Sequence, residues 1–187
     1  KAGEYMKKTI SIGIQGFSDL REKDCFFVDK TSFIKEWWEK SDAVTLITRP
    51  RRFGKTLNMS MLECFFSNKY ADRADLFEGL SIWKEEKYRK LQGTYPVIFL
   101  SFAAVKAGNL EDAKKQIKQE IANLYEENRY LLNKNVLSDN ELKTYNNTTE
   151  EMDDVTAQNA LKSMAAWMER YYGKKVIILL DEYDTPM

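Results

Sequence analysis

A glycine, a lysine and a threonine in direct succession are the residues of this sequence best suited to chemistry. Gly54-Lys55-Thr56 follows the apolar run 44–48 and opens a helix-forming stretch. Backbone N–H groups at a helix start are unpaired, and the helix dipole favours an anion there. Lys55 would then bind the terminal phosphates of ATP, and the Thr56 hydroxyl would bind Mg²⁺. The predicted nucleotide-binding residues are Arg52, Phe53, Gly54, Lys55, Thr56 and Leu57.

This segment departs from the general phosphate-loop pattern G-x-x-x-x-G-K-[ST] at its first position. Arg49 replaces the glycine, and Pro50, Arg51 and Arg52 follow it. Proline fixes its own backbone and biases the preceding residue toward an extended shape, so we interpret the turn as preset by Pro50. The arginines either add positive charge near the polyphosphate or form a solvated basic edge. Taken by itself, Gly54-Lys55-Thr56 could be an ordinary helix N-terminus. The apolar run before it, the helix after it and the later apolar run that ends in Asp-Glu favour nucleotide binding.

Two consecutive acids complete the candidate site. Asp181 and Glu182 directly follow the apolar run 176–180, and ligands of open α/β sheets bind where such strands end. Asp181 would hold Mg²⁺ through its water shell, and Glu182 would polarise the water that attacks the terminal phosphate. We therefore predict Glu182 and Lys55 as catalytic residues, and Thr56 and Asp181 as metal ligands. The alternative is an acidic pair that only caps the strand and hydrogen-bonds in the turn 183–186.

The composition excludes several other classes of protein. The 187 residues are 43% hydrophobic, which suits one globular domain, and 29 basic residues balance 29 acidic ones. This balance argues against wholesale wrapping of nucleic acid. The chain has no histidine, which excludes a Ser-His-Asp triad and a histidine-ligated zinc. Cys25 and Cys64 are far apart, as expected for buried cysteines of a cytoplasmic protein, and no apolar run could span a membrane.

Apolar periodicity predicts strands alternating with helices, and hence an α/β fold with a P-loop NTPase-like parallel sheet flanked by helices. We expect an N-terminal arm and helix over residues 1–43 and the phosphate-loop core over residues 44–187. The aromatic stripe of the first long helix is expected in the core; the alternative places part of this region against adenine. The expected strands are 25–28, 44–48, 96–102 and 176–180, and residues 10–14 are expected to be a short strand or an extended arm. The expected helices are 31–40, 56–68, 71–77, 84–91, 110–133 and 156–172, with a helix fragment and loop in 137–154.

Four segments together resemble the AAA-ATPase-like family, which occurs mainly in bacteria. They are Ile12-Gly13-Ile14 with Phe17 and Leu20-Arg21, Phe27-Val28-Asp29-Lys30-Thr31, Arg49-Pro50-Arg51-Arg52-Phe53-Gly54-Lys55-Thr56-Leu57, and the stretch 178–186. The first loop glycine is typically absent from this family, so Arg49 agrees with the resemblance. The resemblance implies phosphate contact by the Walker A residues Gly54, Lys55 and Thr56, and metal contact by Thr56 and Asp181. It implies water activation by Glu182 of the Walker B segment.

The same resemblance implies a longer protein. Family members often carry a PD-(D/E)xK nuclease-like domain after the ATPase part, and a further strand, encoded after the acidic one, completes their sheet. We therefore expect this chain to be an N-terminal portion truncated after the Walker B strand, with its C-terminal remainder absent. Such a fragment would hydrolyse ATP poorly, and its sheet would be completed by self-association or an altered strand order. Nucleic acid would be a partner through the missing domain.

The leading hypothesis is thus an ATP-binding, ATP-hydrolysing domain that drives or gates a C-terminal effector. One alternative is a scaffold that binds nucleotide without turnover and orders a partner surface. Another is a degenerate loop whose arginines contact nucleic acid or an acidic protein. A small-molecule kinase is disfavoured, because an Asp-Glu pair favours water as the nucleophile.

Overall fold

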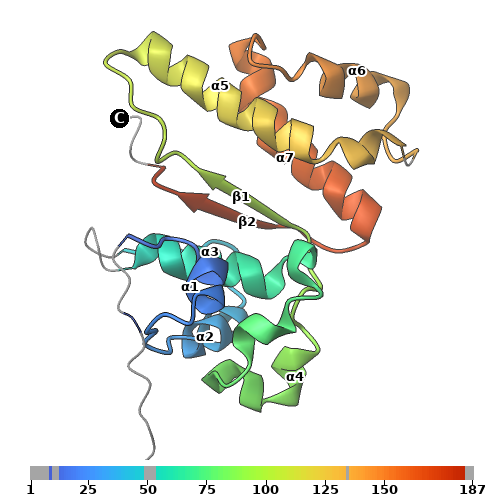
Figure 1. Cartoon of the computed structure of the whole chain (residues 1–187). Helices are drawn as coiled ribbons and strands as arrows, with labels where there is room; N and C mark the ends of the chain where they lie inside the picture. The colour runs from blue at the N-terminus through green and yellow to red at the C-terminus, as the bar shows by residue number, and fades with distance from the viewer. Residues whose placement is uncertain (1–8, 10–12, 49–53, 134, 184–187) are drawn as a thin grey trace, which may run out of the picture. The chain divides into compact units, whose positions relative to one another are not determined.

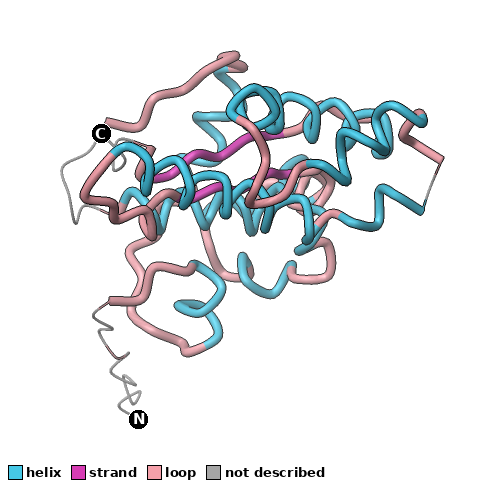
Figure 2. Tube along the Cα trace, turned by 90° about the horizontal axis from the view of Figure 1, so that it is seen from above, coloured by secondary structure: helices cyan, strands magenta, loops and turns pink. Residues whose placement is uncertain are grey.

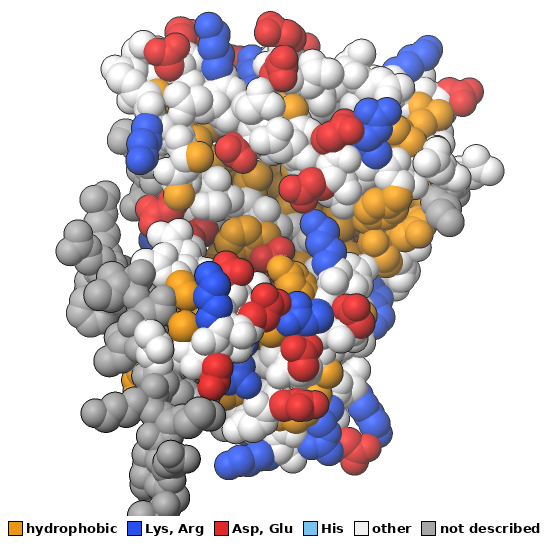
Figure 3. Space-filling view, viewed as in Figure 1, with side chains coloured by type: hydrophobic (Ala, Val, Ile, Leu, Met, Phe, Trp, Pro, Cys, Tyr) orange, Lys and Arg blue, Asp and Glu red, His pale blue; other side chains and the backbone are white. Residues whose placement is uncertain are grey.

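A computed structural model describes residues 9, 13–48, 54–133 and 135–183. The chain divides into two compact units, residues 1–94 and 95–187, and each is described by itself. Figure 1 shows the helices and strands of both in chain order. On the face shown in Figure 3, basic and acidic side chains are interspersed on each unit, as the equal numbers of basic and acidic residues lead one to expect.

The N-terminal unit is helical over the described residues. Its elements are α1 (Phe17–Glu22), α2 (Ser32–Lys40), α3 (Lys55–Phe66) and α4 (Glu86–Arg89), with 3₁₀ turns at Asn68–Tyr70, Ala74–Phe77 and Ser81–Lys84. The helices predicted over 31–40 and 56–68 are therefore confirmed. The helical pieces predicted over 71–77 and 84–91 are shorter than expected: the first is the 3₁₀ turn Ala74–Phe77, and the second is the α-helix α4.

An aromatic core holds this unit together. Phe17 stacks on Phe77 at a ring-centroid distance of 5.1 Å, and Phe65 lies edge-on to Phe77 at 5.1 Å. The half-buried rings of Trp37 and Trp38 on α2 pack against Phe66 of α3 at 5.2 and 5.3 Å. The aromatic residues of α2 thus pack against α3, as their spacing predicts.

A polar network around the buried Thr31 joins the start of α2 to the 3₁₀ turn at Ser81–Lys84. The Asp29 carboxylate accepts hydrogen bonds from the backbone N–H of Thr31 at 2.9 Å and of Ser81 at 2.7 Å. The fully buried Thr31 hydroxyl donates to Asp29 at 2.7 Å and accepts from the N–H of Ile82 at 3.1 Å. Burial raises the pKa of Asp29, but the hydrogen bonds from Thr31 and Ser81 outweigh it and lower the pKa overall. The Asp-Lys-Thr segment, to which the sequence assigns no activity, therefore has a structural role.

Two of the predicted strands in this unit are wrong. Residues 25–28 and 44–48 lie in no strand, and the side chains of Val44 and Leu46 are 87% and 63% exposed. Both segments have strand-like sequences, but a strand also needs a neighbour to accept its backbone hydrogen bonds. Within the described ranges, segment 25–28 makes one backbone hydrogen bond to a distant segment of the chain, from the N–H of Phe26 to the carbonyl of Thr9 at 2.9 Å. Of the short strand or extended arm predicted over 10–14, residues 10–12 lie outside the described residues and 13–14 are in no strand.

The C-terminal unit is a strand–helix–strand arrangement. Its elements are β1 (Val97–Ser101), α5 (Leu110–Glu127), a 3₁₀ turn at Arg129–Asn133, α6 (Asp139–Asn147), α7 (Asp154–Tyr172) and β2 (Ile177–Asp181). The strands pair in parallel, from Val97 opposite Ile177 to Ser101 opposite Asp181. Figure 2 shows them side by side from above. The α/β class and a parallel sheet flanked by helices are confirmed, with two strands among the described residues.

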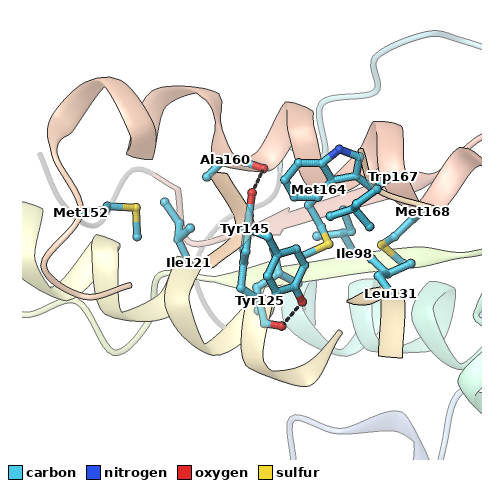
Figure 4. Close-up of a cluster of buried hydrophobic side chains, with 12 residues drawn as sticks. Ile98, Ile121, Tyr125, Leu131, Tyr145, Met152, Ala160, Met164, Trp167 and Met168 are labelled. Carbon is cyan, nitrogen blue, oxygen red and sulfur yellow. Dashed lines mark hydrogen bonds between the residues drawn. The ribbon is translucent and has the colours of Figure 1, made fainter. Parts of the chain in front are cut away.

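The core of this unit lies between β1 and the helices that follow it. Ile98 of β1 is fully buried with Tyr125 of α5, Tyr145 of α6, and Met164 and Trp167 of α7 (Figure 4). The Tyr125 hydroxyl donates to the backbone carbonyl of Ala160 at 2.9 Å, and the Tyr145 hydroxyl donates to the carbonyl of Tyr125. Burial raises the pKa of Tyr125 to about 12. These tyrosines bury their rings and satisfy their hydroxyls, so they are structural. No helix among the described residues is long and apolar enough to cross a membrane.

Glu141 ties α6 to α7. Its carboxylate accepts hydrogen bonds from Arg170 at 2.9 and 3.0 Å, from Trp167 Nε1 at 3.0 Å and from the N–H of Ser138 at 2.8 Å. The last of these is half of a capping box at the start of α6. The Arg170 guanidinium, followed by the Ser138 N–H, holds the pKa of Glu141 well below its usual range. A depressed carboxylate pKa stabilises the fold above the unfolded-state pKa, and this contribution is lost as the pH falls toward the folded-state pKa.

We expect Glu141→Gln to lower the free energy of unfolding at pH 7 by about 1 kcal/mol, after allowance for solvent screening of a partly exposed ion pair. The variant should also lose less stability than the wild type between about pH 5 and pH 2, because it lacks the carboxylate that titrates. Urea unfolding followed by circular dichroism at several pH values measures both effects. Glu126→Gln is the matched control, because Glu126 pairs with Arg129 on the surface and is 70% exposed. Equal losses in the two variants would show that the Glu141 network does not stabilise the unit.

Candidate functional site

Gly54 begins the described part of the predicted phosphate loop. Its backbone is left-handed, with φ 74° and ψ 27°, and no described atom lies within 4 Å of where a Cβ would sit. The conformation, and not crowding, therefore favours glycine at this position. The predicted loop residues Arg52 and Phe53, with Arg49, Pro50 and Arg51, lie outside the described residues.

Helix α3 starts directly after this turn. Lys55, Thr56 and Leu57 form its half-buried first turn, and the N–H of Asn58 closes the turn on the Gly54 carbonyl at 3.0 Å. Among the described residues no side chain caps the helix, and its first turn holds no acid. Uncapped N–H groups and an adjacent lysine make this a positive end that can bind an anion.

The packing of α3 fixes the position of Lys55. The N–H of Phe17 on α1 donates to the Ser60 hydroxyl on α3 at 3.0 Å, and Met61, Leu62 and Phe65 of α3 are buried. A helix buried along its length holds its first residues in place.

The two cysteines do not take part in this chemistry. Both are buried, as predicted, and burial raises the pKa of the Cys64 thiol to about 11. Cys64 is therefore a protonated core residue and not a nucleophile.

Asp181 belongs to the second motif that the sequence predicts. It lies at the end of β2 and is 1% exposed. Its Oδ1 accepts a hydrogen bond from the N–H of Glu182 at 3.0 Å, whereas Oδ2 is buried with no hydrogen-bond partner in the described part of the chain. Leaving a carboxylate oxygen buried and unsatisfied is costly, so such an atom calls for a ligand or water.

The backbone turns sharply at Glu182. This residue has a left-handed φ of 52°, which costs a non-glycine residue about 1 kcal/mol or more. The bond from its N–H to Asp181 is the kind of local capping that the structural alternative for the acidic pair predicts. That alternative accounts for Oδ1 of Asp181 but leaves Oδ2 unexplained. Strain and an unpaired carboxylate oxygen at adjacent residues are typical of functional sites.

Ser101 is a residue to which the sequence assigns no role. The strand register places it opposite Asp181 at the ends of β1 and β2, and the Phe102 N–H donates to the Asp181 carbonyl at 3.0 Å. Ser101 and Asp181 each end an apolar run, and this shared pattern is the sequence signal that could have pointed to Ser101 as a neighbour of Asp181. The pairing became apparent only from the structure.

The side-chain oxygens of Thr56 and Asp181 are of the chemical kind that Mg²⁺ binds. No group of three or more His, Cys, Asp or Glu side chains able to hold a metal occurs among the residues that the structure describes. Mg²⁺ does not need such a cage, because it keeps several waters and binds through one or two carboxylates and the phosphates of its substrate. The unsatisfied Asp181 oxygen and the Thr56 hydroxyl are donors of this kind. Lys55 and Thr56 belong to the N-terminal unit, and Asp181 and Glu182 to the C-terminal unit.

The family model described as "Predicted AAA-ATPase" matches residues 11–187. This chain belongs to that family. The match spans both the Gly54-Lys55-Thr56 turn and the Asp181-Glu182 pair, so the predicted AAA-ATPase contains both motifs within one family segment.

A relative of this predicted AAA-ATPase occurs in Azotobacter chroococcum mcd 1, where it is described as an uncharacterized protein in the vnfD 5' region. The two are 30% identical over 184 residues, which is 97% of this chain and 30% of the relative. The chain thus spans less than a third of the length of that relative. No solved structure shows significant similarity to the present chain.

Proposed function

We propose that this member of the predicted AAA-ATPase family binds Mg²⁺-ATP, and that the full-length protein hydrolyses it. The observation that carries the proposal is the Asp181 carboxylate, which ends a parallel strand and leaves Oδ2 buried without a partner among the described residues. Family membership makes a nucleotide the ligand to test first. The uncapped start of α3 after the left-handed Gly54 supplies a second, phosphate-binding half-site.

Each residue of the site has a distinct role in this proposal. Lys55 and the first-turn N–H groups of α3 bind the phosphates and compensate their negative charge. The Thr56 hydroxyl and the Asp181 carboxylate hold magnesium, which when bound neutralises charge on the phosphates. Glu182 accepts a hydrogen bond from the attacking water and orients it, and then takes up its proton. Arg52, Phe53 and Leu57 are proposed to contact the nucleotide.

We expect Glu182→Gln, in the full-length protein, to bind Mg²⁺-ATP as the wild type does. Its rate of phosphate release should be at least about a hundredfold lower. Glutamine keeps the size of the side chain but cannot accept the proton, and general-base catalysis typically contributes about 10²–10⁴ in rate. Calorimetric titration measures binding, and a phosphate-release assay measures turnover.

The matched control is Glu151→Gln, an exposed glutamate outside the proposed site. Loss of nucleotide binding in Glu182→Gln, with fold preserved by circular dichroism, would assign Glu182 to binding and not to water activation. A wild-type protein that binds ATP but releases no phosphate would favour the scaffold that works without turnover.

Nucleotide turnover would drive or gate an effector. The support for this step is the resemblance to proteins with a nuclease-like domain and the greater length of the Azotobacter relative. In that arrangement nucleic acid would be bound by the effector. Phosphate release that rises on addition of duplex DNA to the protein together with its effector would support the coupling, and an unchanged rate would contradict it.

A further inference from the structure

The two strands of the C-terminal unit end in a pair of polar side chains. Ser101 ends β1 and lies directly opposite Asp181, which ends β2. Partners in a parallel ladder point to the same face of the sheet, and neighbouring strands lie about 4.8 Å apart. Ile98 packs into the helical core, and successive residues of a strand point to opposite faces, so Ser101 and Asp181 point away from that core. The two side chains are therefore neighbours at one end of the sheet.

These neighbouring side chains do not bond to each other. Oδ1 of Asp181 accepts a hydrogen bond from the N–H of Glu182, and Oδ2 has no partner within the described residues. The hydroxyl of the half-buried Ser101 accepts a long hydrogen bond from the N–H of Ala103 at 3.4 Å. A hydroxyl oxygen can accept two hydrogen bonds, so Ser101 keeps an acceptor beside the unpartnered carboxylate oxygen. Two such acceptors fit one ligand that donates to both.

We propose that Ser101 is a further residue of the magnesium site, where one water bound to magnesium donates to Oδ2 of Asp181 and to Oγ of Ser101. The inference rests on the proposed binding of Mg²⁺-ATP. Mg²⁺ keeps several of its waters, and a water whose oxygen faces the cation has only its two hydrogens to offer. Such a water needs two acceptors, and Asp181 and Ser101 present them side by side. Ser101 is thus a positioning residue, because it acts through the water.

The backbone on both sides of this pair is held in place. The N–H of Phe102 donates to the Asp181 carbonyl at 3.0 Å, which extends the pairing of the strands beyond Ser101. The N–H of Val105 then donates to the Phe102 carbonyl at 3.0 Å, and the Val105 side chain is 1% exposed. Figure 1 shows the chain leaving β1 beside the end of β2. A hydroxyl on a fixed backbone can orient a water more precisely than one on a loose loop.

Calorimetric titration of ATP with and without Mg²⁺ tests this role through binding alone, in the full-length wild type and its Ser101→Val variant. Losing one hydrogen bond to a water on the metal should reduce the gain in ATP affinity from Mg²⁺ by about three- to tenfold. ATP affinity without metal should stay the same, because Ser101 does not contact the nucleotide. A merely structural role of Ser101 would instead lower the affinity with and without metal alike.

Ser101→Thr is the matched control for the valine variant. Threonine and valine have nearly the same shape and both favour strands, so the pair differs in the hydroxyl alone. Ser101→Thr should keep the gain from Mg²⁺ within about twofold of the wild type. Ser163→Ala removes a hydroxyl from another half-buried serine of this unit, in the middle of α7, and should bind as the wild type does. Circular dichroism shows whether each variant keeps its fold.

Mn²⁺ in place of Mg²⁺ gives a second readout. Broadening of its electron paramagnetic resonance signal, by water labelled with the magnetic oxygen isotope, counts the waters on the metal of bound Mn²⁺-ATP. We expect equal counts in the wild type and Ser101→Val, because Ser101 acts through a water. An additional water in the variant would show that Ser101 binds the metal directly, and would overturn the proposal.

The titrations distinguish a failure of this inference from a failure of the proposed function. Equal gains from Mg²⁺ in the wild type, Ser101→Val and Ser101→Thr would overturn the role of Ser101 and leave the Mg²⁺-ATP site intact. So would an equal loss in the valine and threonine variants, because the hydroxyl would then have no part in it. A wild type with no gain from Mg²⁺ would contradict the proposed function, and this inference with it.

Discussion

Replacing Lys55 with alanine should lower the affinity for Mg²⁺-ATP by about ten- to a hundredfold. A charge-assisted hydrogen bond is worth roughly 1.5–3 kcal/mol, and alanine removes both the charge and the donor. The N–H groups of α3 remain, so weak binding should persist. Titration of Mg²⁺-ATP into both proteins by calorimetry measures the change.

Lys90→Ala is the control for this variant. Lys90 is 75% exposed and pairs with Glu86 on the surface of α4, so its loss should leave nucleotide affinity unchanged. Equal affinities of Lys55→Ala and the wild type would remove Lys55 from the phosphate-binding site. Circular dichroism spectra of both variants confirm that the comparison concerns binding and not folding.

Replacing Gly93 with alanine is expected to destabilise the N-terminal unit by about 3–4 kcal/mol. Gly93 has a left-handed φ of 68°, and a Cβ there would lie 2.4 Å from the Cα and 3.1 Å from the N of Ala71. These are backbone atoms, so no side-chain rotation relieves the clash. The N–H of Gly93 also donates to the Phe65 carbonyl at 2.8 Å, which holds it close to the end of α3. Urea unfolding with tryptophan fluorescence measures the loss.

Gly79→Ala separates the clash from the backbone conformation. Gly79 has a similar φ of 79°, but no described atom lies within 4 Å of its Cβ position. Its substitution should cost only about 1–2 kcal/mol, the penalty of a left-handed alanine. If both variants lost the same stability, the close approach of Gly93 to Ala71 would have no energetic consequence.

Helix prediction from this sequence succeeds where the helix has its own periodicity and caps. The segments at 56–68 and 156–172 form α3 and α7, and α7 ends at a left-handed Gly173, as its sequence predicts. Strand prediction succeeds at 96–102 and 176–180, because these two strands pair with each other. It fails at 44–48, whose apolar, β-branched residues fit a strand equally well but have no strand partner among the described residues.

The sequence was enough to propose the residues of the candidate site, and these assignments stay predictions, whereas the local geometry of the residues could not be predicted. The order of Gly54-Lys55-Thr56 and Asp181-Glu182 along the chain, each next to an apolar run, was enough to single them out. The unsatisfied oxygen of Asp181 and the left-handed Glu182 depend on burial and backbone angles, which sequence patterns do not encode. The role of Asp29 was also hidden, because its partners Ser81 and Ile82 are about fifty residues away.

The central claim is that Asp181 holds the magnesium of a bound nucleotide. Calorimetric titration of ATP with and without Mg²⁺, into the wild type and Asp181→Asn, tests it most directly. We expect Mg²⁺ to tighten ATP binding to the wild type by about tenfold or more, and to give little gain in Asp181→Asn, which keeps the size of the side chain but loses the anionic oxygen. A wild type that binds no ATP, or an equal gain from Mg²⁺ in both proteins, would contradict the claim.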